Sequence, residues 1–228
     1  MSDSTDAGRA LDAALSTRIV EFFNLLKDPE LEVRRQALVT LNGAAHSKPF
    51  LIKNQLSHLL PLLYGELAVN TKLMRVVVMG PFRHTIDDGL EARRSAYEAL
   101  YSVLENLFPS IDNVDEFVAK VVKGLEDQHE IKILCSLMLT RLAAAAPLET
   151  QNCTCFPIDI GLMCLDLEQM TPKFQGMLVI SARDKDSVTR QDIEKQHEMR
   201  RSCIRTSVAL AQLQSPGIYP LRTECSWV

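Results

Sequence analysis

The sequence has few glycines, few aromatic side chains and no long apolar run. It contains 9 Gly, 10 Pro and 6 % aromatic residues among 228, which excludes collagen-like and low-complexity chains and leaves little for a β-sandwich or barrel. No apolar run approaches the ~18 residues of a membrane-spanning helix, so we expect no membrane partner. The chain has instead 32 Leu and 19 Ala, which are frequent in packed helices. The composition therefore predicts an all-α fold.

The chain also lacks a surplus of basic residues. Its 25 Lys and Arg stand against 29 Asp and Glu, a net charge of −4, so we expect no nucleic-acid partner. The beginning, MSDSTDAGRALDAAL, is acidic and polar where a secretory signal would be basic and then apolar. We therefore expect a cytoplasmic and nuclear protein whose six cysteines are free thiols.

Apolar residues recur at steps of three and four along most of the chain, as they do on one face of a helix. This spacing predicts helices over residues 10–27, about 31–41, 51–64, 113–142 and 187–213. Asp28 and Pro29 separate the first two, as cap and first helical residue, and Gly43 is expected to end the second. Pro61 is expected to kink or end the third helix, and Gly124 lies near a break within 113–142.

One helical pattern occurs more than once. DPELEVRRQALVTL, from Asp28, and DDGLEARRSAYEAL, from Asp87, are identical at 7 of 14 positions at a shift of 59 residues. A weaker third copy, EDQHEIKILCSLML, begins at Glu126, and HEMRRSCIRTSVAL is a fourth candidate. The positions that carry the repeat are Asp28, Val33, Arg34, Ala37 and Leu41 in the first copy, Asp87, Arg93, Ala96 and Leu100 in the second, and Ile131, Lys132 and Leu139 in the third.

The repeated pattern resembles the second helix of a HEAT repeat. Its acidic residue caps the helix, its aliphatic and Ala positions bury one face, and its Arg is placed to pair with acidic groups of a neighbouring repeat. The alternative is that any amphipathic helix opening with Asp matches in part. The fold predicted is an all-α HEAT-repeat α-solenoid with one inserted β-hairpin.

The insertion lies between the first two copies, where a shift of 59 exceeds the HEAT period of roughly 40–47 residues. Residues 65–86, GELAVNTKLMRVVVMGPFRHTI, do not have a helical pattern. A β-branched run at 76–78 favours extended structure, and Gly80 and Pro81 predict a turn before a second extended piece. The simplest structure is a β-hairpin that projects from the helices and docks a partner; the alternative is a loop packed back on its own helices.

No catalytic or metal-binding motif stands out. The chain has no Gly-rich phosphate loop, no His-Glu-x-x-His and no Gly-x-Ser-x-Gly. Asp87 and Asp88 are more simply a helix cap than a catalytic pair. A zinc site at Cys153, Cys155 and Cys164 lacks the usual spacing and a nearby His. We therefore expect no enzyme activity, cofactor, metal or small-molecule substrate, and a small core residue at Cys135.

Longer stretches carry a more specific resemblance. DPELEVRRQALVTLNGAAHSKPFLI, MGPFRHTIDDGLEARRSAYEALYSVLE and GLEDQHEIKILCSLMLTRL resemble the C-terminal region of the cullin-associated and neddylation-dissociated protein family, also known as the TATA-binding-protein-interacting family. The resemblance covers about 20–145, resumes weakly over 184–213, and departs over 148–170 and after 214. It implies HEAT repeats over 1–147 with the hairpin at about 67–86, a divergent segment at 148–175, last HEAT-like helices at 176–213 and a frayed tail at 214–228.

The resemblance also implies a function. Family members are long HEAT solenoids that wrap around a cullin, and their C-terminal repeats bind the cullin N-terminal domain and compete with the substrate-receptor adaptor. They thereby act in assembly and exchange of SCF and other cullin-RING ubiquitin ligases. This chain resembles only the C-terminal arm, so we expect a fragment, a truncated gene model or a separate short protein.

The element that carries this function, by resemblance, is the hairpin from Lys72 to Ile86. The residues expected to contact the partner are Lys72, Arg75, Val76, Val78, Met79, Gly80, Pro81, Phe82, Arg83 and His84. The alternative function is a HEAT-repeat scaffold of another pathway, in transcription or transport, with no cullin partner.

Overall fold

The structure is a computed structural model that describes residues 3–80, 82–147 and 190–212. The chain divides into two compact units, Met1–Val114 and Asp115–Val228, and each is described by itself. The expected divergent segment at 148–175 and the expected tail at 214–228 lie outside the described residues. In the part of the chain that the structure describes, no helix combines the length and apolarity needed to cross a membrane.

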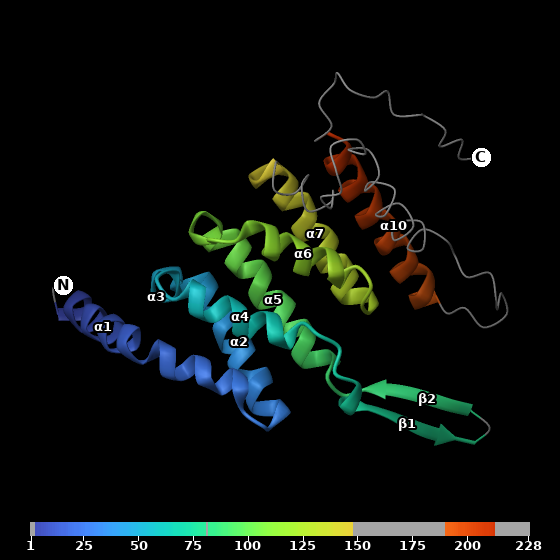
Figure 1. The fold of residues 1–228 in the computed structure, drawn as a ribbon, viewed down its shortest axis with the longest axis horizontal. Helices are drawn as coiled ribbons and strands as arrows, with labels where there is room; N and C mark the ends of the chain where they lie inside the picture. Colours follow the sequence, from blue (N-terminus) through green and yellow to red (C-terminus); the bar gives the residue numbers. More distant parts are fainter. Residues whose placement is uncertain (1–2, 81, 148–189, 213–228) are drawn as a thin grey trace, which may run out of the picture. The chain divides into compact units, whose positions relative to one another are not determined.

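The first unit consists of helices and one two-stranded sheet (Figure 1). Its elements in chain order are α1 (Asp3–Phe23), the 3-10 turn η1 (Asn24–Lys27), α2 (Leu31–Ser47), α3 (Pro49–Lys53), α4 (Leu56–Glu66), the 3-10 turn η2 (Thr71–Leu73), β1 (Met74–Met79), β2 (Phe82–Asp87), α5 (Leu90–Leu107) and the 3-10 turn η3 (Phe108–Ser110). The predicted all-α fold with one inserted hairpin is confirmed.

The two copies of the repeated pattern form α2 and α5, which pack against each other. Ser102 of α5 donates a hydrogen bond to Asn42 of α2 at 2.5 Å, and Arg35 of α2 interacts electrostatically with Glu91 of α5. Both pairs are close to the 59-residue shift of the repeat. Equivalent residues therefore lie nearly side by side, and the two helices run in the same direction.

Most of the repeated apolar positions are buried as expected. The exposed fraction is 3 % or less at Ala37, Leu41, Ala96, Leu100, Ile131 and Leu139. Val33 is the exception, with 37 % of its surface exposed, and its expected burial is wrong. The equivalent residue of the second copy, Ala92, is 3 % exposed. This position is therefore buried in the second and third copies but not in the first.

Several helix ends differ from the prediction. Gly43 does not end α2, which continues to Ser47 and stops just before Pro49. The expected helix over 51–64 is two helices, α3 and α4, and α4 continues through Pro61 to Glu66. The first predicted helix begins earlier than expected and finishes as the 3-10 turn η1.

The second unit contains α6 (Val114–Gly124), α7 (His129–Ala145) and α10 (Arg190–Ala211) among its described residues. The predicted break at Gly124 is confirmed. Helices α7 and α10 pack together, and Thr206 of α10, with no exposed surface, donates to the carbonyl oxygen of Ser136 in α7 at 2.8 Å. Cys135 is fully buried, as its apolar neighbours predicted.

Candidate functional site

The inserted segment is an antiparallel hairpin with a regular register. Its paired residues run from Met74 opposite Asp87 to Met79 opposite Phe82. Gly80 at the turn has a φ of 61°, in the left-handed region that glycine adopts without strain. The alternative of a loop packed on its own helices is therefore not what the structure shows.

One face of the hairpin is apolar and open. Side chains alternate between the faces of a strand, so Met74, Val76 and Val78 share a face. Val76 and Val78 have exposed fractions of 62 % and 64 %, whereas Val77, on the opposite face, is half-buried. Arg83 and Thr85 lie across from Val78 and Val76 in the register. We call the two exposed valines, Val76 and Val78, the open face.

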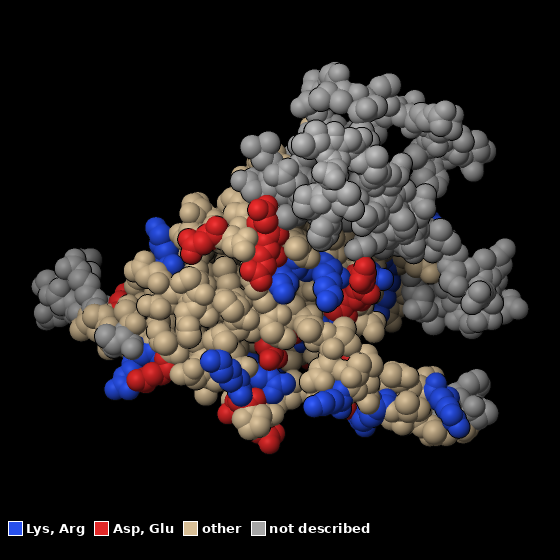
Figure 2. Space-filling model, viewed as in Figure 1, with Lys and Arg blue, Asp and Glu red and all other residues tan. Residues whose placement is uncertain are grey.

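The charged residues of the hairpin are mostly basic. Lys72, Arg75 and Arg83 are exposed, and Figure 2 shows basic side chains along a largely uncharged hairpin surface. Asp88 binds the Arg75 guanidinium, with an Nε to Oδ2 distance of 2.7 Å, at an exposed position. An exposed pair of this kind contributes little stability. The hairpin thus presents apolar and basic groups together.

The base of the hairpin is buried and tightly bonded. Asp87, the last residue of β2, accepts a hydrogen bond from the Arg93 guanidinium of α5 at 2.8 Å, and the two side chains are only 7 % and 3 % exposed. The other carboxylate oxygen of Asp87 accepts the backbone N–H of Gly89 at 3.0 Å. Asp87 therefore joins the strand to the first turn of α5. Its expected role as the helix cap is wrong, because α5 begins at Leu90 with Gly89 as its N-cap and Asp87 is the last residue of the strand.

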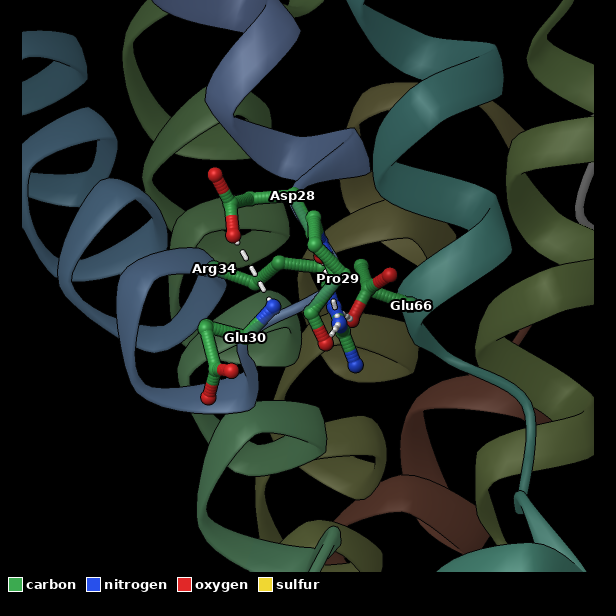
Figure 3. Close-up of polar contacts among 5 residues, drawn as sticks. All are labelled: Asp28, Pro29, Glu30, Arg34 and Glu66. Carbon is green, nitrogen blue, oxygen red and sulfur yellow. Dashed lines mark hydrogen bonds and ion pairs between the residues drawn. The ribbon is translucent and has the colours of Figure 1, made fainter.

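The first copy of the repeat makes a related junction without a hairpin (Figure 3). Asp28 Oδ1 accepts the backbone N–H of Glu30 at 2.9 Å, as Asp87 does for Gly89. Arg34 donates to the carbonyl oxygens of Asp28 and Pro29, at 2.7 and 3.2 Å, and to Glu66 at 3.2 Å. The expected pairing of the repeated Arg with an acid of another segment is thus present at Arg34, whereas Arg93 pairs with the Asp of its own copy.

A small pocket lies where these two junctions meet. It has a volume of about 60 Å³, and both Arg34 and Arg93 line it, with Glu66, Leu73 and Gly89. Leu73 immediately precedes β1, and a Cβ at Gly89 would lie 2.9 Å from Leu73 Cδ1. The hairpin base therefore lies close to α5 at Gly89 and shares this pocket with the arginines of both copies.

The remaining charges of α2 form surface pairs. Hydrogen bonds from Arg35 and Gln36 lower the pKa of the exposed Glu32 carboxyl to about 2. Among the described residues, no group of three or more His, Cys, Asp or Glu side chains is placed to hold a metal ion.

Comparison with known proteins decides the family. A family model described as "TATA-binding protein interacting (TIP20)" matches residues 51–224. The chain belongs to this family. The matched range of this TATA-binding protein interacting family runs across 148–170 and beyond 214, where we expected the resemblance to fail.

Curated relatives have matching names. The chain is 38 % identical over 209 residues to cullin-associated NEDD8-dissociated protein 1 of Drosophila melanogaster, which covers 92 % of this chain and 16 % of that protein. It is 37 % identical over 207 residues to cullin-associated NEDD8-dissociated protein 2 of Rattus norvegicus, covering 90 % and 15 %. It is 35 % identical over 199 residues to the C-terminal part of cullin-associated NEDD8-dissociated protein 1 of Emericella nidulans, covering 87 % and 17 %. The chain thus spans about a sixth of the length of these relatives.

The structure brings most of the predicted contact residues of this family member onto one hairpin. Arg75, Val76, Val78, Arg83 and His84 lie on its strands, Gly80 at its turn and Lys72 in η2 just before it. Pro81, and the side chains of Met79 and Phe82, lie outside what the structure describes. Their role in binding stays a prediction.

Sequence reasoning missed the residues that hold the hairpin. Arg93 and Asp87 were expected only to support the repeat, and Gly89 and Leu73 were not singled out. The signal was present in the alignment of the two copies, where Asp and Arg recur six residues apart.

Proposed function

We propose that this chain is a non-catalytic interaction module that binds the N-terminal domain of a cullin and competes there with the substrate-receptor adaptor. It would act in the assembly and exchange of SCF and other cullin-RING ubiquitin ligases, in the cytoplasm and nucleus. The proposed partner is a protein surface rather than a nucleic acid, a membrane or a small molecule.

One observation carries this proposal: an open apolar face on a hairpin that projects from packed helices. Val76 and Val78 are more than 60 % exposed, and an isolated two-stranded hairpin gains little stability from water-exposed side chains. Covering such a face with a partner lowers the free energy by about 25 cal/mol per Å² of apolar area removed from water. The relatives named above supply the partner class, because their names describe them as cullin-associated.

The first prediction tests the open face. Val76→Glu with Val78→Glu places two carboxylates where the partner would bury apolar surface, so we expect binding to a purified cullin to weaken by about a hundredfold. Binding is measured by isothermal titration calorimetry with the 228-residue chain. The same variant should lose the ability to displace the adaptor from the cullin in a competition assay.

A matched control separates the hairpin from a general effect of added charge. Val39 of α2 is also an exposed valine, at 45 %, and lies outside the hairpin, so Val39→Glu should bind and compete as the unaltered chain does. Equal weakening by Val39→Glu and by the hairpin variant would contradict a role for the open face. Failure of the unaltered chain to bind any cullin would contradict the proposed function itself.

A second candidate function is a scaffold in transcription, and the description of the matched family favours it, since that description names an interaction with the TATA-binding protein. Affinity capture with the tagged chain, followed by identification of the bound proteins, distinguishes the two. Recovery of the TATA-binding protein without a cullin would support the second candidate.

A further inference from the structure

Hydrogen bonds of two neighbouring aspartates hold the base of the hairpin. Its first strand is tied at the base by the backbone N–H of Asp88, which donates to the carbonyl oxygen of Leu73 at 3.1 Å. Its second strand ends at Asp87, which bonds to Gly89 and Arg93. The bond between Asp88 and Leu73 joins the two sides of the hairpin at its base, and Asp87 connects this base to the first turn of α5. A small movement there would therefore swing the whole hairpin.

The bonds at this junction differ greatly in strength. Arg75 and Asp88 are 62 % and 42 % exposed, so solvent screens their attraction. Arg93 and Asp87 are almost fully buried, and neither charge can leave its partner without losing a bond that water does not replace there. The buried pair is therefore the part of the junction that resists bending.

The equivalent arginines of the two copies bind different partners. In the first copy the Arg34 guanidinium reaches back to the carbonyl oxygens of Asp28 and Pro29 and is 15 % exposed. In the second copy the Arg93 guanidinium donates to the carboxylate of Asp87, the equivalent Asp, and the Arg93 side chain is 3 % exposed. The same pair of repeat positions thus joins two helical segments in one place and fixes a strand to a helix in the other.

We propose that Arg93 and Asp87 are positioning residues, which set the direction of the hairpin relative to α5 and so hold the open face ready for its partner. The consequence for binding rests on the proposed function above, whereas the direction of the hairpin does not. A surface held in its bound geometry loses less conformational freedom on binding. Without the buried pair the hairpin would still form, but it would sample many directions.

The experiment measures the direction of the hairpin in the 228-residue chain. Spin labels are attached through ketone-bearing unnatural residues at the exposed positions Thr85 of β2 and Glu105 of α5, a chemistry that leaves the native cysteines unmodified. Pulsed electron paramagnetic resonance then gives the distribution of distances between the labels. We expect one narrow distribution for the unaltered chain, and a distribution at least about twice as broad for Asp87→Asn and Arg93→Met, because the base can then open locally.

Asp87→Asn is the milder variant and carries the test where Arg93→Met does not fold. Its amide oxygen still accepts the N–H of Gly89, while the negative charge opposite Arg93 is lost. Arg94→Met is the matched control, because Arg94 is the next residue of α5 and pairs with Glu98 at a half-exposed position. Its distance distribution should equal that of the unaltered chain.

A second measurement needs no substitution. The amide hydrogens of Asp88 and Gly89, bonded at the hairpin base, should exchange with solvent at least about tenfold more slowly than those near the turn, since local opening then begins at the turn. Equal exchange at base and turn, or a distance distribution that neither Asp87→Asn nor Arg93→Met broadens, would overturn the positioning role. Equal broadening by Arg94→Met would do the same.

Measurement of cullin binding distinguishes a failure of the proposed function from a failure of the positioning role. Asp87→Asn without labels should bind the cullin about tenfold more weakly through lost preorganisation, and Arg94→Met should bind normally. If the unaltered chain binds no cullin, the proposed function fails while the distances still test the direction of the hairpin. If it binds and Asp87→Asn binds equally well with a narrow distribution, only the positioning role fails.

Discussion

At the scale of single residues, two buried thiols of the second unit make its stability depend on pH. Cys135 and Cys203 are fully buried thiols that form no disulfide among the described residues. Burial raises the pKa of both thiols above the ordinary value because the interior disfavours a thiolate. The folded chain therefore keeps these protons at a pH where the unfolded chain releases them. Their contribution to stability is complete below the unfolded pKa of about 8.5 and declines as the pH rises above it.

This decline of stability with rising pH gives a measurable prediction for Cys135. The unaltered chain should lose about 2 kcal/mol of unfolding free energy between pH 8 and pH 10 through this thiol alone, whereas Cys135→Ala lacks that loss. Urea unfolding followed by circular dichroism at both pH values measures the difference between the two proteins. That difference should shrink or reverse at pH 10, and a difference independent of pH would contradict the buried thiol as its source.

For most apolar residues of the repeated pattern, burial was predictable from the sequence. Leu41, Leu100 and Leu139 are apolar positions of an amphipathic helix and are buried in the structure. Val33 belongs to the same pattern but is exposed, because periodicity shows which residues share a helix face and not which other helix covers that face. Arg93 shows the same limit, since the repeat pattern contains both Arg93 and Asp87 but does not show that Asp87 ends a strand and pairs with Arg93.

At the scale of elements, the helices were easier to predict than their ends. Apolar residues at helical spacing predicted α6 and α7, and the repeated pattern predicted α5. Gly43 did not end α2, however, and α4 continues through Pro61. A glycine costs a helix about 1 kcal/mol, which favourable neighbours outweigh. The hairpin was predictable because the β-branched run at 76–78 and the Gly80 turn lie next to each other in the sequence.

The contact between α7 and α10 was not predictable, because its two members are far apart in the chain. It includes a polar bond within an apolar interface: Thr206 donates to the carbonyl oxygen of Ser136 at 2.8 Å and lies 3.2 Å from the hydroxyl of Thr140. Thr206→Val preserves the shape of the side chain and removes these bonds. We expect a loss of about 1 kcal/mol in the free energy of unfolding, measured by urea unfolding.

Thr40 provides the control for Thr206. The hydroxyl of Thr206 also lies 3.1 Å from the carbonyl oxygen of Ser202, four residues earlier. Thr40 makes a bond of this second kind, to the carbonyl oxygen of Gln36, at an exposed position of α2 where water can replace it. Thr40→Val should therefore leave the unfolding free energy nearly unchanged. Equal losses for the two variants would mean that the bond to the residue four positions earlier, and not the contact between helices, accounts for the effect at Thr206.

At the scale of the whole molecule, the helices described within each unit are stabilised by the helices that pack on them. In a helical stack each repeat buries its apolar face on the next, as α2 does on α5. A helix with no neighbour on one side keeps that face exposed. In α1, Leu11 and Leu15 have exposed fractions of 56 % and 39 % and lie four residues apart on one helix face, so α1 presents an apolar surface to solvent.

This surface leads to a prediction about self-association. Burying exposed apolar faces between two copies lowers the free energy. The chain should therefore form dimers or larger species as its concentration rises, which sedimentation velocity measures. Leu11→Glu with Leu15→Glu should keep it monomeric at the same concentrations, because two buried carboxylates would oppose the contact. The hairpin variant Val76→Glu with Val78→Glu is the comparison that locates the contact: if it abolishes association and the α1 variant does not, the copies meet through the hairpin and the expectation for α1 is wrong.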